Sequence, residues 1–224
     1  MSRYNTEQLL ELYSTKYDSE SFNKRDFDKF VKYFTLLDKQ FGLKNRETMI
    51  DLGCGSGVKT AAFGQFYNSC TGVDLSPGAI AKAKQLIKDD KIEFVCADLF
   101  TLDKQKHDLI TAFGFSYFNE ENEEVLADKI HEIIQFTGNE QATMIMSSFT
   151  DFSGTAPSGW VMHSKIQLEN LLRKLKTLGY KAELYFPESD RRNYFGFGME
   201  NFAKETVRRF SSRKRNFFLV VRNS

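Results

Sequence analysis

A glycine-rich turn directly after a short apolar run constrains this chain more than any other feature. The segment reads Met49-Ile50-Asp51-Leu52-Gly53-Cys54-Gly55-Ser56-Gly57. Glycines at this spacing let a backbone turn tightly after a strand and approach a ligand closely. The pattern differs from the dinucleotide-binding G-x-G-x-x-G, because Val58 stands in place of the last glycine. An acid at position 51 suits a ligand with a positive charge better than a pyrophosphate.

Three further short apolar segments follow, each ending near a residue suited to ligand contact. Residues 70–76 contain Asp74, which lies 21 positions after Gly53. An acid at about this separation can accept hydrogen bonds from a ribose diol. Residues 92–99 contain a third strand-ending acid, Asp98, and residues 107–113 end in Phe113. Four such segments in order form a joint signal that the glycine turn alone does not give.

Together these segments resemble motifs I to IV of the class I S-adenosylmethionine (AdoMet) methyltransferases, closely over residues 45–150 and loosely in the flanks. The resemblance implies AdoMet as cofactor and S-adenosyl-L-homocysteine as product. It implies that Asp51 lies under the methionine part, that Asp74 binds the ribose, and that Asp98 contacts the adenine amino group. The residues expected to bind the cofactor are Asp51, Gly53, Cys54, Gly55, Gly57, Asp74, Leu75, Asp98, Leu99 and Phe113.

Each of these assignments has a plainer alternative. The glycines also fit an ordinary strand-to-helix turn, and Asp98 also fits a strand-ending acid with no ligand. Phe113 fits core packing as well as it fits a cofactor contact.

Strand and helix patterns alternate along the chain from residue 47 onward, which indicates a parallel sheet covered on both faces. The apolar spacing predicts helices at 6–15, 25–41, 120–136 and 164–178, and one beginning with Ser76 and Pro77. Later strands are expected at 142–149, 181–186 and 217–221. The resemblance implies an α/β, Rossmann-like fold with a seven-stranded, mostly parallel sheet in the order 3-2-1-4-5-7-6.

A chain of 224 residues fits one α/β domain with additions. We expect residues 1–44 to form an N-terminal helical lid, 45–150 the cofactor-binding core, and 151–224 the acceptor-side elements and last strands. The stretch between the last two strands, 187–216, is longer than a hairpin needs.

Composition excludes several classes of function. The formal net charge of +1 points to neither nucleic acid nor membrane as a partner. The three cysteines, Cys54, Cys70 and Cys96, match no zinc or redox spacing, so we expect reduced thiols and no metal site. We find no apolar signal region and no run of ~20 apolar residues. A cytoplasmic monomer or homodimer is expected.

The residues at the end of the fourth apolar segment limit the class of methyl acceptor. Ala112-Phe113-Gly114-Phe115 lacks the two prolines that base-nitrogen methyltransferases of this family carry there, which counts against methylation of DNA or RNA bases. We expect transfer to an O or N atom of a small molecule. Methyl transfer from a sulfonium depends mainly on positioning, so no catalytic triad is required.

Candidate catalytic residues are therefore few. His163 could act as a general base, or serve as an ordinary loop or capping residue. Tyr17 resembles a lid tyrosine of small-molecule methyltransferases, whereas Tyr13 also fits the apolar stripe of a short helix. The residues expected to contact the acceptor are Tyr17, Phe115, Tyr117, Trp160 and Arg192.

Two rival functions remain. Segment 191–215 mixes arginines, aromatics and glycines, so an RNA or protein methyltransferase could use it as a binding patch, whereas its Gly-rich part 191–199 also suits an acceptor lid. A non-catalytic AdoMet-binding protein would carry the same first three motifs.

Overall fold

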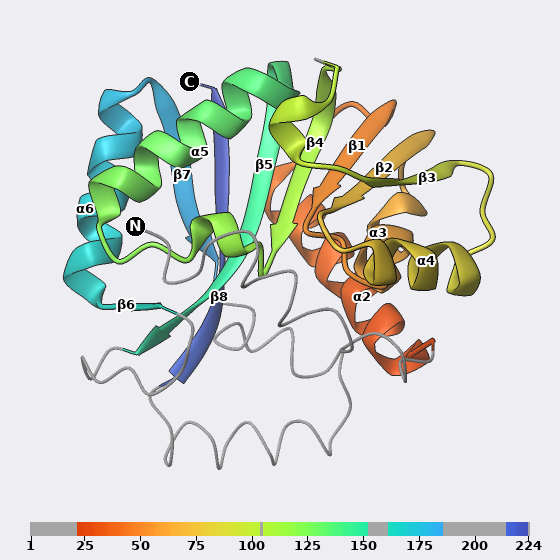
Figure 1. The fold of residues 1–224 in the computed structure, drawn as a ribbon. Helices are drawn as coiled ribbons and strands as arrows, with labels where there is room; N and C mark the ends of the chain where they lie inside the picture. Colours follow the sequence, from red (N-terminus) through yellow and green to blue (C-terminus); the bar gives the residue numbers. More distant parts are fainter. Residues whose placement is uncertain (1–21, 104, 152–160, 186–213, 224) are drawn as a thin grey trace.

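The computed structural model describes residues 22–103, 105–151, 161–185 and 214–223. In these ranges one sheet of eight strands is covered by helices on both faces (Figure 1). The elements are α2 (Lys24–Phe41), β1 (Thr48–Leu52), α3 (Val58–Gly64), β2 (Ser69–Asp74), α4 (Pro77–Leu86), β3 (Ile92–Cys96), η1 (Leu99–Thr101), β4 (His107–Phe113), η2 (Ser116–Phe118), α5 (Glu123–Thr137), β5 (Gly138–Asp151), β6 (Met162–His163), α6 (Lys165–Thr177), β7 (Tyr180–Tyr185) and β8 (Lys214–Asn223). The predicted α/β class is confirmed.

The main path of the sheet runs β3-β2-β1-β4-β5-β8-β7. Since β7 and β8 are the expected sixth and seventh strands, the predicted order is confirmed. Strands β1 to β5 pair in parallel, and β8 is antiparallel to both β5 and β7. An eighth strand, β6, is absent from the prediction, and it pairs with the end of β5. Chain order reverses between β1 and β4, which is the point where open α/β sheets bind ligands.

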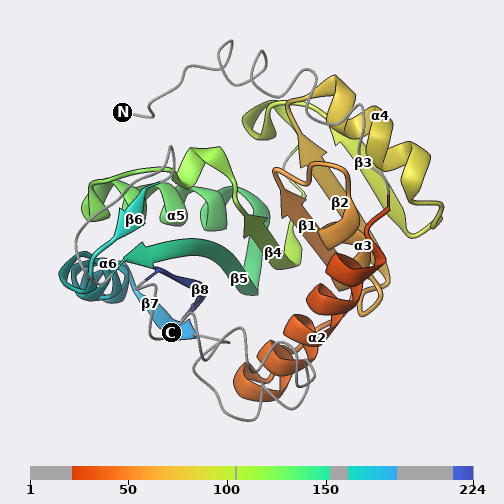
Figure 2. The same cartoon turned by 90° about the horizontal axis from the view of Figure 1, so that it is seen from below.

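Alternation of side chains gives the sheet two apolar faces. Ile50 and Ile110 belong to the cluster that packs against α5 and α6. Met49 and Leu109, one residue earlier on the same strands, belong to the cluster that packs against α2 and α3. Figure 2 shows these two helix pairs on opposite sides of the curved sheet. Because Asp51 is two residues after Met49, its side chain lies on the α3 side.

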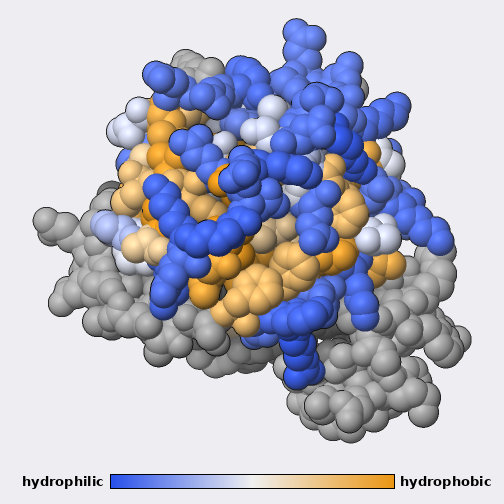
Figure 3. All heavy atoms as spheres, turned by 90° about the vertical axis from the view of Figure 1, so that its right-hand side faces the viewer, coloured by the Kyte–Doolittle hydropathy of each residue, from blue (hydrophilic) through white to orange (hydrophobic). Residues whose placement is uncertain are grey.

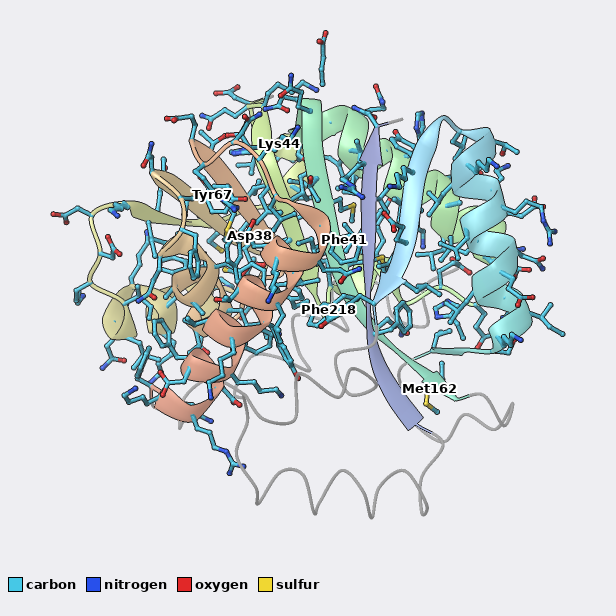
Figure 4. All side chains as sticks on the ribbon, turned by 180° about the vertical axis from the view of Figure 1, so that it is seen from behind. Asp38, Phe41, Lys44, Tyr67, Met162 and Phe218 are labelled. Atoms are coloured by element: carbon cyan, nitrogen blue, oxygen red, sulfur yellow. The ribbon has the colours of Figure 1, made fainter. Side chains whose placement is uncertain are left out.

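Helix α2 begins one residue earlier than predicted and ends as predicted. Asn23 caps its first turn, and Gly42 takes a left-handed conformation (φ 59°) after its last residue. Phe34 is fully buried on the face toward the sheet. Figure 4 shows α2 across the back of the sheet, with Tyr67 and Phe218 close to it. The Phe34 and Tyr67 ring centroids are 6.0 Å apart.

The later helices start at their caps. The Asn122 side chain accepts the first amides of α5, so this helix begins three residues later than predicted. Val125, which was expected on the apolar side, is 41% exposed, and the buried face of α5 runs through Leu126, Ile130 and Ile134. Ser164 and Gln167 form a capping box at the start of α6, and Gly179 (φ 89°) follows its end. Strand β5 is longer at both ends than predicted.

The surface on the β3 side of the molecule is mixed. Figure 3 shows apolar side chains gathered in its lower part and bordered by hydrophilic ones. Large apolar residues that are exposed in the described ranges lie in separate parts of the chain: Phe22, Phe100, Val125 and Ile166. Scattered exposure of this kind is usual. In the same ranges, no helix is both long and apolar enough to cross a bilayer.

Candidate cofactor site and active site

A buried carboxylate lies at the carboxyl end of β1. Asp51 is 2% exposed, and its two oxygens accept hydrogen bonds from the hydroxyls of Thr60 (2.6 Å) and Thr111 (2.7 Å). Thr111 is the register partner of Asp51 on β4. Burial raises the pKa of Asp51, while the two hydroxyls and the nearby charge of Lys59 act in the opposite direction. The acid is therefore held in one orientation by two protein hydroxyls.

Backbone hydrogen bonds hold the glycine loop to the end of β2. The amides of Gly53 and Cys54 both donate to the Val73 carbonyl, at 2.8 and 3.0 Å, and the Gly57 amide donates to the Cys54 carbonyl at 3.1 Å. Gly53, Gly55 and Gly57 have φ values of 67°, 56° and 79°. L-residues with side chains rarely adopt this left-handed region, so the turn depends on glycine.

Two of these glycines also make room for the protein's own rings. A Cβ on Gly57 would lie 2.6 Å from the Phe94 ring, and one on Gly53 would lie 3.0 Å from the Phe115 ring. The Cys54 thiol is buried beside the loop, and burial raises its pKa. Part of the glycine pattern thus serves packing against neighbouring segments, which is one of the alternatives left open by the sequence.

Asp74 braces the loop from the end of β2. Its Oδ2 accepts the Gly55 amide at 2.9 Å, and its Oδ1 accepts the Ser76 amide at 2.9 Å. Ser76 in turn caps α4, with Pro77 in the first turn, as predicted. Each carboxylate oxygen has about two lone-pair sites, so both oxygens of Asp74 can accept a further hydrogen bond.

The remaining positions after β2 and β3 differ in exposure. Leu75 is half-buried, and its carbonyl accepts the Cys96 thiol at 3.7 Å. Asp98 is exposed and caps η1 through the Phe100 amide at 3.0 Å. Leu99 is buried in the core on the α5 side, so its side chain faces away from solvent. A ligand at this edge could meet the carboxylate of Asp98, but only the backbone of Leu99.

Phe113 ends β4 with its side chain in the core. It is 3% exposed and packs against the rings of Phe30, Phe63 and Phe218, with centroids 5.6, 5.0 and 5.9 Å away. Its carbonyl accepts the Lys59 ammonium at 2.8 Å. The side chain of Phe113 therefore packs in the core, which was one of the two alternatives for this residue. Its backbone carbonyl remains at the carboxyl end of β4.

Phe115 and Tyr117 follow β4 but point in different directions. Phe115 lies beside the glycine loop, next to Gly53. The Tyr117 hydroxyl donates to Glu132 on α5, and the Lys129 ammonium lies 5.0 Å from its ring centroid. Burial and then the Glu132 carboxylate raise the pKa of Tyr117. Of the two, Phe115 is the one near the carboxyl end of β1, and Tyr117 ties η2 to α5.

His163 lies in β6 and is 1% exposed. Its Nε2 lies 3.0 Å from the Glu120 carbonyl oxygen. A carbonyl oxygen only accepts, so the proton of this contact is on Nε2. Burial lowers the pKa of His163. A general base must reach the proton it removes, so the geometry favours a structural tie to the loop before α5 and gives the predicted base no support.

Three predicted site residues lie outside the described residues: Tyr17, Trp160 and Arg192. The same holds for Tyr13, for the expected helix 6–15 and for segment 191–199. Their roles stay predictions. Among the residues that are described, no group of three or more His, Cys, Asp and Glu side chains is arranged to hold a metal ion.

Sequence reasoning missed Thr60, Thr111 and Lys59. Thr60 lies nine positions after Asp51, in the first turn of α3, and Thr111 is in mid-strand. The register of β1 on β4 would have placed Thr111 opposite Asp51. No pattern in the sequence points to the contact between Lys59 and β4, because the two segments lie 54 positions apart.

The part of the chain that holds this network matches a known family. Residues 49–138 match the family model described as a methyltransferase domain. This part of the chain is similar to a methyltransferase domain. The family resemblance on the four sequence motifs is thereby confirmed. Within the methyltransferase domain, Asp51 and the glycine loop lie at its beginning and Asp74 and Asp98 lie further along.

A curated relative matches over a longer region. Malonyl-[acyl-carrier protein] O-methyltransferase of Acetivibrio thermocellus is 28% identical over 125 residues, which cover 51% of this chain and 42% of that protein. The chain thus spans less than half the length of this relative. A second protein of the same name, from Anoxybacillus flavithermus, is 40% identical over 55 residues, 24% of this chain and 21% of that protein.

Solved structures share the fold across nearly the whole chain. The plantazolicin methyltransferase BpumL in complex with SAH has a TM-score of 0.58 at 16% identity, covering 96% of this chain and 90% of that one. The [4+2]-cyclase SpnF has a TM-score of 0.64 at 15% identity, covering 98% and 96%. At such identities the likeness shows the fold, and the predicted Rossmann-like methyltransferase fold is confirmed.

Proposed function

We propose that this chain transfers a methyl group from AdoMet to an O or N atom of a small-molecule acceptor. The observation that carries the proposal is the joined network at the ends of β1 and β2. Asp74 binds the Gly55 amide, and Asp51 is fixed below the same loop by two hydroxyls. This network lies in the segment that matches the methyltransferase domain. A preorganised edge of this kind suits a ligand that must be held in one orientation.

The residues along this edge fit AdoMet. Asp74 and Asp98 offer carboxylate oxygens, which suit the hydroxyls of a ribose and the amino group of an adenine. The left-handed turn at Gly55 exposes backbone to close approach. The half-buried Leu75 offers an apolar contact between the two acids. We propose that the residues expected from the sequence to bind the cofactor do so. Leu99 and Phe113 would contribute only their backbone groups.

Methyl transfer from AdoMet requires the protein mainly to position the two reactants. When bound, AdoMet supplies a methyl group that its sulfonium already activates. The chain's residues then need to align the acceptor with that methyl and exclude water. Alignment alone lowers barriers by roughly 7–11 kcal/mol in favourable cases. A buried His163 is compatible with this requirement, since no proton transfer by that residue is needed.

The acceptor side is assigned by position in the chain. We propose that residues 1–44 cover the bound ligands, that 45–150 bind the cofactor, and that 151–224 complete the acceptor site. The curated relatives are named for a malonyl group carried by a protein, and BpumL for plantazolicin. These names support an acceptor that is a small molecule or a small group on a carrier, and they leave the methylated atom open.

A second candidate follows from the cyclase among the structural relatives. SpnF shares the fold and is a [4+2]-cyclase by name, so the fold by itself does not determine the reaction. A chain that binds AdoMet without methyl transfer would retain the same edge of the sheet. The RNA or protein alternative rests on segment 191–215, of which 191–213 lies outside the described residues.

Product formation separates these candidates. The purified chain is incubated with AdoMet and panels of carboxylates, amines, phenols and carrier-bound acyl groups, and S-adenosylhomocysteine is measured by mass spectrometry. Acceptor-dependent product, lost in Asp74→Ala, supports the proposal. Methylation of RNA alone would contradict it. Cofactor binding with no turnover on any panel, including RNA and peptides, would favour the non-catalytic candidate.

A further inference from the structure

A lysine lies where chain order reverses in the sheet. Lys59 is in the first turn of α3, and its Nζ donates to the Phe113 carbonyl at 2.8 Å. Phe113 is the last residue of β4, the strand next to β1. This contact therefore places an ammonium group at the carboxyl end of the sheet between β1 and β4. Open α/β sheets bind ligands at this point.

The surroundings hold the ammonium group in place. The Phe30 and Phe113 ring centroids lie 5.7 and 6.0 Å from Nζ, on α2 and β4. Burial raises the pKa of Asp51, and the charge of Lys59 opposes this rise, while the hydroxyls of Thr60 and Thr111 donate to the two Asp51 oxygens. The Phe113 carbonyl and the two aromatic rings orient the ammonium group toward the carboxyl end of β4.

The order of charged groups along the strand ends indicates which part of a ligand this cation could bind. Asp98 follows β3, Asp74 ends β2, Asp51 is in β1, and Lys59 binds the end of β4. These strands are neighbours in the order β3-β2-β1-β4. AdoMet has a matching order of adenine, ribose and amino acid. Two acids suit the first two parts, and the amino acid then extends toward β4.

We propose that Lys59 binds the carboxylate of the amino-acid end of AdoMet. This assignment rests on the proposed function, because it uses the placement of the nucleoside over β2 and β3. The carboxylate is the single anionic group of this cofactor, and an ammonium on a flexible stem is a suitable partner for it. Lys59 thereby selects ligands that carry a complete amino acid over nucleosides that lack its carboxylate.

The test is a thermodynamic cycle between one side chain and one ligand group. Calorimetric titration compares S-adenosylhomocysteine with its decarboxylated analogue, in the wild-type chain and in Lys59→Met. Methionine keeps much of the apolar stem beside Phe30. We expect the wild type to prefer the carboxylate-bearing ligand by about tenfold or more, and Lys59→Met to lose that preference while binding the analogue as before.

Two further variants serve as controls for this experiment. Lys59→Arg keeps the charge and should keep most of the preference. Lys176→Met removes the same charge from the exposed last turn of α6, outside the segments assigned to the cofactor, and it should leave both affinities unchanged. If Lys59→Met does not fold, Lys59→Gln replaces it, and the wild-type preference must still be present.

Three outcomes would overturn the assignment, and they are distinguishable. Equal weakening of both ligands in Lys59→Met would make Lys59 a structural support of the loop. A wild type that binds both ligands equally would show that the carboxylate has no cation partner. A wild type that binds neither ligand would overturn the proposed function itself.

Discussion

The Asp74 carboxylate accepts the Gly55 amide at 2.9 Å, so the end of β2 holds the loop that follows β1. The same carboxylate accepts the Ser76 amide with its other oxygen. One side chain therefore connects the glycine turn to the start of α4. Loss of this carboxylate should change the shape of the loop and weaken the cofactor binding that we propose for it.

The first prediction concerns this connection. Asp74→Ala should weaken S-adenosylhomocysteine binding by about 1–3 kcal/mol, or roughly 5- to 150-fold, because ligand hydroxyls and the Gly55 amide both lose a charged acceptor. Native-state hydrogen exchange at the Gly55 amide should also become faster without ligand. Calorimetry and exchange by mass spectrometry measure the two effects.

A matched variant separates the two roles of Asp74. Asp74→Asn keeps one carbonyl oxygen for a backbone amide but loses the charge and one acceptor. It should therefore show intermediate affinity. A folded Asp74→Ala chain with wild-type affinity and wild-type exchange at Gly55 would remove Asp74 from the site.

The second prediction concerns Gly57. Its φ is 79°, and a Cβ there would lie 2.6 Å from the Phe94 ring. Gly57→Ala should therefore lower the free energy of unfolding through backbone strain and through the clash. Gly179 has φ 89° and nothing within 4 Å of an added Cβ, so Gly179→Ala reports the strain alone. Urea unfolding should rank Gly57→Ala as clearly less stable than Gly179→Ala, and equal stabilities would refute the packing role.

The third prediction concerns the cost of a buried charge. Burial raises the pKa of Asp51, so its folded-state pKa lies above the unfolded value of about 3.9. The stability linked to a raised carboxyl pKa is present below the unfolded pKa and is lost as pH rises through the folded pKa. Asp51→Asn should thus melt at or above the wild-type temperature at pH 7, with the gain shrinking toward pH 4.

Asp108 supplies the control for this experiment. It is 8% exposed, and it accepts N–H groups from Glu47, Thr48 and Asn139. Hydroxyl partners, such as those of Asp51, can reverse their direction to meet an amide, whereas N–H donors cannot. Asp108→Asn should therefore destabilise the fold. A lower melting temperature for Asp51→Asn than for Asp108→Asn at pH 7 would show that the ionised Asp51 stabilises the fold.

The fourth prediction concerns acid sensitivity. Burial lowers the pKa of His107 and of His163. His107 Nδ1 is buried without a hydrogen-bond partner in the described part of the chain. With folded-state pKa values below the unfolded value of about 6.5, the unfolded chain binds more protons, so stability falls as pH drops below about 6.5.

Unfolding free energies between pH 7.5 and 5.5 test this dependence. Each histidine contributes a slope of at most about 1.4 kcal/mol per pH unit. His107→Gln should flatten the profile in part, and His107→Gln with His163→Gln should flatten it further. A double variant with the wild-type slope would assign the acid sensitivity to other groups.

The fold and the proposed cofactor-binding edge could be predicted from the sequence because their motifs are local. The turn from Gly53 to Gly57 requires left-handed backbone whatever surrounds it, and Ser76 with Pro77 marks a helix start from a few residues alone. Strand order came from the family resemblance, and pairing of β1 with β4 follows from it. These features needed no knowledge of side-chain contacts.

Other parts of the site depend on contacts between distant segments. Phe94 packs against Gly57, and Lys59 binds the end of β4, but neither pairing has a local signal. His163 lies in the short strand β6, which pairs with an extension of β5 that apolar spacing did not predict. The burial of His163 follows from that pairing. The residue was expected in a loop, and in the structure it is buried and contacts the Glu120 carbonyl.

Calorimetric titration of this chain with S-adenosylhomocysteine measures whether the carboxyl end of the sheet binds the cofactor product. We expect one binding site per chain in the wild type and no measurable binding in Gly55→Val. A branched side chain at φ 56° would strain the turn and occupy the space of the ligand. Circular dichroism confirms that the variant is folded. Absence of binding by the folded wild type, or equal affinity in a folded Gly55→Val chain, would contradict the account.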